Sequence, residues 1–228
     1  MTLHGQQCRI IALFFQRTQR TARFPQRPTD AAFVVIINGV SPAATTETAR
    51  TSRKGTKPVI LYLHGRNGNA AEDCRKWAKV ATQFGWVLCP QGPGDSGGGG
   101  RTWMNSAQAG KAVMDASLSA LRAKHKGRVQ RYGNILVGFS EGAFVAMQAG
   151  LQDQKTWSRW LILAASDRYW VGDAPSSLTG GSGGGKLQRV YLLTGETDGV
   201  AEFKVDQILG PKVVGDAWGF GGNHRRAA

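Results

Sequence analysis

Residues Asn134 to Gln148 read NILVGFSEGAFVAMQ, and this stretch decides the fold. The apolar run 135–137 suits a buried parallel strand, and the apolar run 143–147 suits a packed helix. Between them stands the G-x-S-x-G sequence Gly138-Phe139-Ser140-Glu141-Gly142. A serine in a sharp strand-to-helix turn needs small residues two positions before and after it, because side chains there would collide with the adjoining backbone. We therefore predict a nucleophile elbow at Ser140; the alternative is a tight turn without chemistry.

Three other segments place polar residues directly after apolar runs. Pro58 to Leu63 (PVILYL) leads into His64-Gly65-Arg66, and Arg189 to Thr194 (RVYLLT) leads into Gly195-Glu196-Thr197-Asp198. The glycine-rich loop AWGFGGNH, residues 217–224, is expected to follow a last strand at Lys212 to Val214. An open parallel sheet places its sites at the carboxyl ends of its strands, which favours Asp198 as a functional acid. A turn aspartate that caps the next helix is the alternative.

Ser140, Asp198 and His224 together would supply a complete set of catalytic groups. Serine is a weak nucleophile until an imidazole takes its proton, and the imidazole needs a carboxylate to fix its tautomer. The other three histidines are less suitable: His4 lies near the N-terminus, His125 lies in the basic stretch RAKHKGR, and His64 closes a strand beside a glycine turn, where a structural role is favoured. Elimination leaves His224 as the base.

The order of these motifs carries a resemblance to a known family. With LHGRNGN, GWVLCPQG, GFSEGAFVA, LLTGETDGV and GGNH in succession, residues 58–228 resemble a small bacterial-type α/β-hydrolase of the carboxylesterase, phospholipase and polyester-depolymerase-like branches. The resemblance implies an α/β-hydrolase fold with a mostly parallel central sheet and helices on both faces. The length of about 170 residues leaves no room for a large lid domain. The resemblance also implies that the backbone N–H groups of Arg66 and Glu141 form the oxyanion hole.

The end of the chain departs from the family pattern. Four residues follow His224, where the family usually continues into a final helix, and Asn223 stands where glycine is common. We therefore expect the hydrolase domain to be truncated at its C-terminus, which bears on how firmly His224 is held.

The resemblance implies an acyl-enzyme on Ser140 and a small-molecule or polymeric carboxylic ester as substrate. A peptidase or amidase with the same triad, and an inactive binding module of the same fold, stay open as alternatives. Trp103 and Met104 follow a glycine run and are candidates for contact with the substrate, although Trp103 equally suits a packing role. No cofactor or metal is expected, because the histidines and cysteines lack ligand spacing.

The first 57 residues differ from the rest of the chain. They hold nine Lys or Arg against Asp30 and Glu47, which is half of the formal net charge of +14. We interpret them as a basic, poorly ordered N-terminal extension, either a targeting segment or a disordered tail. Their apolar runs are too short for a transmembrane helix. The domain contains a local basic cluster of Arg122, Lys124, Lys126, Arg128 and Arg131. We interpret it as a solvated helix end and expect no specific nucleic-acid binding.

Cysteine usage bears on the compartment. Cys74, in a predicted helix, and Cys89, at the end of the next predicted strand, either form a disulfide or remain two buried thiols. An exported enzyme is slightly favoured over a cytoplasmic one. The sequence makes no prediction of oligomeric state.

Overall fold

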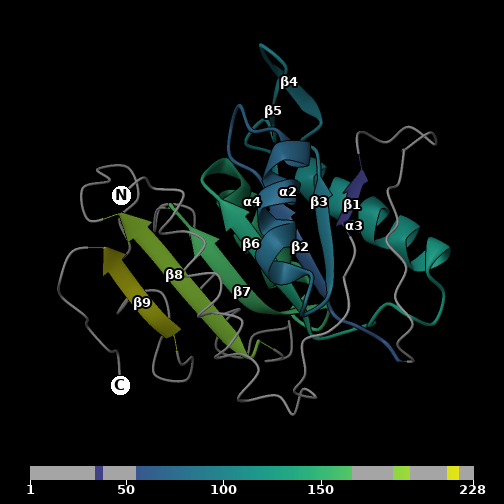
Figure 1. Ribbon diagram of the computed structural model, residues 1–228. Helices are drawn as coiled ribbons and strands as arrows, with labels where there is room; N and C mark the ends of the chain where they lie inside the picture. Colours follow the sequence, from purple (N-terminus) through teal and green to yellow (C-terminus); the bar gives the residue numbers. More distant parts are fainter. Residues whose placement is uncertain (1–33, 38–54, 166–186, 196–214, 221–228) are drawn as a thin grey trace.

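The computed structural model describes residues 34–37, 55–165, 187–195 and 215–220 (Figure 1). Its centre is a seven-stranded sheet in the order β1-β3-β2-β6-β7-β8-β9, in which every neighbouring pair is parallel. The strands are β1 (Val34–Ile37), β2 (Val59–Leu63), β3 (Trp86–Pro90), β6 (Asn134–Phe139), β7 (Trp157–Leu163), β8 (Arg189–Gly195) and β9 (Gly215–Phe220). A small antiparallel pair, β4 (Gly94–Gly97) and β5 (Gly100–Thr102), stands apart from this sheet. The predicted, mostly parallel sheet is confirmed.

Helices cover both faces of the sheet because its strands are apolar on both sides. Along β2, Val59, Leu61 and Leu63 pack in a cluster with α3 (Ala107–Lys124) and α4 (Glu141–Gln152). The intervening Ile60 and Tyr62 pack in a second cluster with α2 (Ala70–Ala81). This alternation is the two-residue period of a strand. It places α2 on one face and the other two helices on the opposite face, as predicted.

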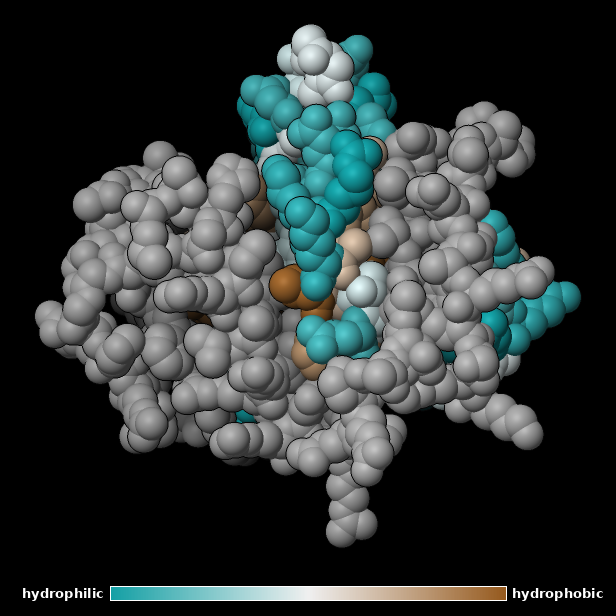
Figure 2. Space-filling model, viewed as in Figure 1, coloured by the Kyte–Doolittle hydropathy of each residue, from teal (hydrophilic) through white to brown (hydrophobic). Residues whose placement is uncertain are grey.

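Helix α2 shows why the sequence forms an amphipathic helix at this place. Asn69 caps it, since its side-chain oxygen accepts from the N–H groups of Ala71 and Glu72. Its buried residues recur every three or four positions: Ala70, Cys74, Trp77 and Ala81. The outward face is hydrophilic (Figure 2). No helix among the described residues is both long and apolar enough to cross a membrane.

Cys74 of α2 and Cys89 of β3 form a disulfide, with 5.7 Å between their Cα atoms. Both cysteines are fully buried. Of the two readings that the sequence left open, the disulfide is the one observed. It fastens α2 to the sheet beside the loop that leaves β2.

Two strands lie where the sequence did not predict them. β1 falls within residues 1–57, so the segment interpreted as an N-terminal extension contributes an edge strand beside β3. β9 spans Gly215–Phe220, so the expected last strand at Lys212 to Val214 begins later and includes part of the segment taken for a glycine-rich loop. Pairing with β8 gives this segment its strand conformation, which its two glycines and its aspartate would not favour by intrinsic propensity.

Candidate active site

Ser140 occupies the sharp turn between β6 and α4 in a conformation that is rare for a residue with a side chain. Its φ is 53° and its ψ is −118°. The Ser140 N–H donates to the Leu163 carbonyl at 2.9 Å, and its own carbonyl accepts from Ala143 N at 2.9 Å. A positive φ at a non-glycine residue costs free energy and occurs preferentially at functional sites. These bonds fix the strained backbone in place.

The two glycines around Ser140 are required by close backbone approach. A Cβ at Gly138 would lie 2.6 Å from the Gly142 carbonyl oxygen, and a Cβ at Gly142 would lie 2.3 Å from the Leu63 carbonyl oxygen. The first turn of α4 is therefore packed directly against the end of β2. The contact at Gly138 is the expected collision with the adjoining backbone, whereas the contact at Gly142 is with a strand far away in the sequence.

The loop after β2 lies against the serine. A Cβ at Gly65 would lie 3.3 Å from the Ser140 Cβ, so the loop backbone runs beside the serine side chain. Arg66, the residue whose N–H the family resemblance assigns to the oxyanion hole, follows directly. The start of α4 also presents unpaired N–H groups and a positive helix dipole on this side.

His64 holds this loop from inside the protein. The ring is buried; its Nε2 accepts from Gly92 N at 2.9 Å, and its Nδ1 donates to the Gly65 carbonyl at 2.7 Å. The backbone donor at Nε2 requires that this nitrogen carry no proton, which sets the tautomer. Burial lowers the pKa of His64, while the bond to Gly65 acts in the opposite direction. The structural role favoured by the sequence agrees with these contacts.

The Glu141 carboxylate ties two other segments to the serine turn. Its side chain is 4% exposed. Four groups donate to it: Arg66 Nη2 at 3.1 Å, Thr102 Oγ1 at 2.8 Å, Trp103 N at 3.1 Å and Asn105 N at 3.1 Å. Burial by itself raises the pKa of Glu141, but these hydrogen bonds outweigh it and hold the pKa below its ordinary value. The carboxylate is therefore charged at neutral pH.

Residues 103–105 lie beside Glu141 in an unusual backbone conformation. Met104 and Asn105 are consecutive non-glycine residues with φ of 55° and 49°. Trp103 is fully buried and its Nε1 donates to the His64 carbonyl at 2.8 Å, which favours the packing role for this side chain. Met104 is 55% exposed and is the largest apolar side chain that this turn presents to solvent. Met104 thus stays a candidate for substrate contact, whereas Trp103 supports the loop.

The structure brings together Ser140, Arg66, Glu141, Trp103 and Met104. Asp198 and His224 lie outside the described residues, and their roles stay predictions. The strands that precede them, β8 and β9, are parallel to β6 and end at the same edge of the sheet as the serine turn. Within the part of the chain that the structure describes, no three His, Cys, Asp or Glu side chains are grouped as metal ligands.

Sequence reasoning assigned Glu141 a backbone role and missed its side chain. The carboxylate partners Thr102 and Trp103 are separated from it by 39 and 38 residues along the chain. An acid in the first turn of a helix is ordinarily explained by the helix dipole alone. The one available signal was its position in an otherwise apolar helix start, where an isolated carboxylate needs partners.

The parallel sheet, the helices on both faces and the strained serine between β6 and α4 define the α/β-hydrolase fold. Among the described residues no separate lid domain covers the serine edge.

Several solved structures share this fold. Esterase PE8 has a TM-score of 0.53 and 20% identity over 75% of this chain and 86% of its own. The Bacillus cereus carboxylesterase has a TM-score of 0.52 and 15% identity over 77% and 85%. Arabidopsis thaliana SOBER1 has a TM-score of 0.51 and 15% identity over 75% and 92%. At these identities the likeness concerns the fold. No family model and no curated protein matches the sequence.

Proposed function

We propose that this protein is a serine hydrolase that cleaves carboxylic esters through an acyl-enzyme on Ser140. The observation that carries the proposal is the positive φ of Ser140 at the junction of β6 and α4. Such strain persists where the surrounding structure fixes it, and at functional sites it aims a reactive side chain. The esterases among the similar structures support ester hydrolysis as the reaction.

In the proposed mechanism, His224 accepts the Ser140 Oγ proton as the oxygen attacks the ester carbonyl carbon. Collapse of the tetrahedral intermediate breaks the bond to the alcohol oxygen, which leaves with the proton from His224. His224 then accepts a proton from water as the water oxygen attacks the acyl carbon. The second tetrahedral intermediate collapses, the bond to Ser140 Oγ breaks, the acid is released and the proton returns to Ser140. Asp198 orients the imidazole and stabilises its cation.

The backbone N–H groups of Arg66 and Glu141 would hold the oxyanion. The close packing around the serine supports this role. Gly65 lies against Ser140 and Gly142 lies against Leu63, so both donors belong to segments that border the serine. One such donor contributes about 3 kcal/mol to transition-state stabilisation. The positive end of the α4 dipole acts on the same developing charge.

The substrate is proposed to be a small-molecule or polymeric ester. Met104, exposed on the strained turn beside Glu141, offers a flexible apolar surface for an acyl or alcohol group. We also propose an oxidising, extracytoplasmic setting, which the buried disulfide Cys74–Cys89 supports, since such bonds are rare in reducing compartments.

The test is hydrolysis of p-nitrophenyl acetate and butyrate by the full chain, with intact mass after fluorophosphonate treatment. Ser140→Ala and His224→Ala should each lower kcat by at least a thousandfold, and Ser140→Ala should also lose the label. Ser119→Ala, an exposed serine of α3, is the matched control and should behave as the wild type.

The outcomes separate the candidate functions. Faster turnover of a p-nitroanilide than of the ester would favour the amidase alternative. A folded wild-type protein that neither turns over esters nor takes the label would refute the hydrolase proposal and leave a binding module.

A further inference from the structure

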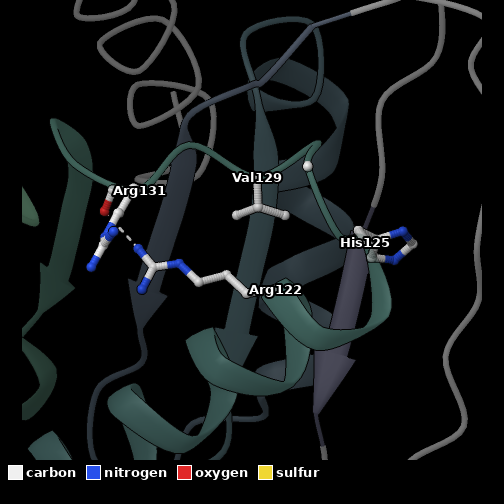
Figure 3. A pocket seen from close by; sticks show the side chains of 5 residues that line it. Arg122, His125, Val129 and Arg131 are labelled. Atoms are coloured by element: carbon white, nitrogen blue, oxygen red, sulfur yellow. Dashed lines mark hydrogen bonds between the residues drawn. The ribbon is translucent and has the colours of Figure 1, made fainter.

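A hollow lies at the opposite end of the sheet from Ser140. It is a cavity of about 240 Å³ between the C-terminal end of α3 and the segment that enters β6 (Figure 3). Its lining residues are Arg122, His125, Gly127, Val129 and Arg131. We propose that this cavity binds the phosphate group of a small, soluble phosphate monoester. The name "phosphate pocket" is used below for these five residues.

Arg122 and Arg131 point their side chains toward one another at one side of the pocket, whereas His125 points away from them (Figure 3). Arg122 Nη2 donates to the Arg131 carbonyl at 2.6 Å, which fixes the position of the guanidinium. Arg122 Nε is buried and has no hydrogen-bond partner among the residues that the structure describes. Since a buried donor without an acceptor is costly, this geometry leaves a place for an acceptor atom from a ligand.

The two arginine charges of the pocket have no close ion pair among the described residues. Burial, followed by the charge of Arg131, lowers the pKa of Arg122, and the charge of Asp153 is the largest opposing influence. Asp153 acts on Arg122 without an ion-pair contact, and its Oδ1 accepts from Thr156 N at 3.0 Å. A bound anion would relieve the repulsion between the two arginines.

More cations surround this place. Lys155 and Arg131 lie 4.1 Å and 5.2 Å from the centre of the Tyr132 ring, which is 38% exposed. Lys124, Lys126 and Arg128 flank His125 in sequence. Two arginine forks among further positive charges match a dianionic phosphate better than a carboxylate, because the phosphate offers more acceptor oxygens and more charge.

The size and lining of the pocket favour a small ligand. Its volume is below the range of about 300–1,000 Å³ that is usual for drug-sized molecules. Val129 is partly buried and packs on the main core, so it gives the hollow an apolar wall for the carbon atoms of an ester. These features suit a phosphate headgroup with a short organic substituent.

The phosphate pocket is separate from the serine site. β6 begins at Asn134, beside the pocket, and ends at Phe139, directly before Ser140. At about 3.3 Å per residue, a strand of this length places the two sites about 20 Å apart. The proposal therefore does not depend on hydrolase activity, and Ser140→Ala should bind phosphate as well as the wild type does.

The test is a titration of the full chain with inorganic phosphate and with glycerol 3-phosphate at low and constant ionic strength. Binding is followed by calorimetry and by the ¹⁵N resonances of the arginine Nε–H groups. Arg122→Gln and Arg131→Gln should each weaken binding at least tenfold, and acetate should bind at least tenfold more weakly than phosphate. Arg75→Gln, an exposed arginine of α2 on the other face of the sheet, removes the same charge and should leave the affinity unchanged.

Thermal unfolding of each variant checks that it folds. Because Arg131 is exposed, its replacement should leave the fold intact. A saturable response that is lost in both pocket variants and retained in Arg75→Gln supports the proposal. No saturable response, or an equal loss in Arg75→Gln, overturns it in favour of diffuse charge attraction. Binding to phosphatidic acid vesicles without any response to the soluble phosphates would also overturn it, since the ligand would then be a membrane surface.

Discussion

Replacement of Glu141 by glutamine tests whether the buried carboxylate organises the serine edge. Oε1 accepts from Arg66, Thr102 and Asn105, and Oε2 accepts from Thr102 and Trp103. Glutamine keeps one acceptor oxygen and replaces the other by an amide that points hydrogen atoms at existing donors. At least one backbone N–H of residues 103–105 would then lose its partner.

The magnitude follows from these contacts. A buried donor without a partner costs about 1–3 kcal/mol, and the bonds that remain lose the assistance of the negative charge, about 1 kcal/mol more. The contact with Arg66 is discounted, because that side chain is 54% exposed and its charge is screened. We therefore expect Glu141→Gln to lower the free energy of unfolding by about 2–4 kcal/mol.

Turnover should fall as well, because Arg66 follows the glycine that packs against Ser140, and residues 103–105 hold the side chain of the residue after the serine. We expect kcat for p-nitrophenyl acetate to fall by about tenfold to a hundredfold as these segments lose their fixed positions. Glu72→Gln is the matched control, since it makes the same chemical change at an exposed position of α2. It should change the free energy of unfolding by less than about 0.5 kcal/mol and leave kcat unchanged.

The pH dependence gives an independent readout. The pKa of Glu141 is lower in the folded protein than in the unfolded chain, so its contribution to stability is complete above the unfolded pKa. That contribution is lost as the pH falls through the folded pKa. Urea unfolding of the wild type should therefore show decreasing stability in acid, and Glu141→Gln should show a smaller decrease. A variant with wild-type stability, turnover and acid sensitivity would refute the organising role of the carboxylate.

One further substitution and one chemical reduction test the framework around the serine. Gly142→Ala puts a methyl group 2.3 Å from the Leu63 carbonyl oxygen, so urea unfolding should show a loss of about 1–3 kcal/mol in stability. Intact mass should show that fluorophosphonate no longer labels Ser140. Normal labelling would contradict the close packing of α4 on β2. The Cys74–Cys89 disulfide is buried and spans 15 residues of sequence, so its reduction should lower the free energy of unfolding by about 3 kcal/mol. Alkylation of the unfolded, unreduced chain should modify neither of these two cysteines. Alkylation of both would contradict the bond.

The sequence by itself determined most of the sheet and the turn at Ser140. β2, β6 and β8 are continuous apolar runs, and a run buried on both faces is recognisable without knowledge of its neighbours. Gly138 indicated the turn for a similar reason, since the steric conflict that it avoids is with residues 142–146 of the same turn, whereas the conflict at Gly142 is with the end of β2 and depends on the tertiary structure.

Only the tertiary structure decided the features that depend on distant partners. The Cys74–Cys89 bond depends on how α2 packs against β3, and β1 becomes a strand because β3 offers it an edge. The carboxylate of Glu141 is surrounded by donors from residues 66 and 102–105 because the fold brings these loops together. Periodicity and steric patterns are local properties of a sequence. The partners of a buried charge, a thiol or an edge strand are set by the packing of the whole domain, and a local pattern does not specify them.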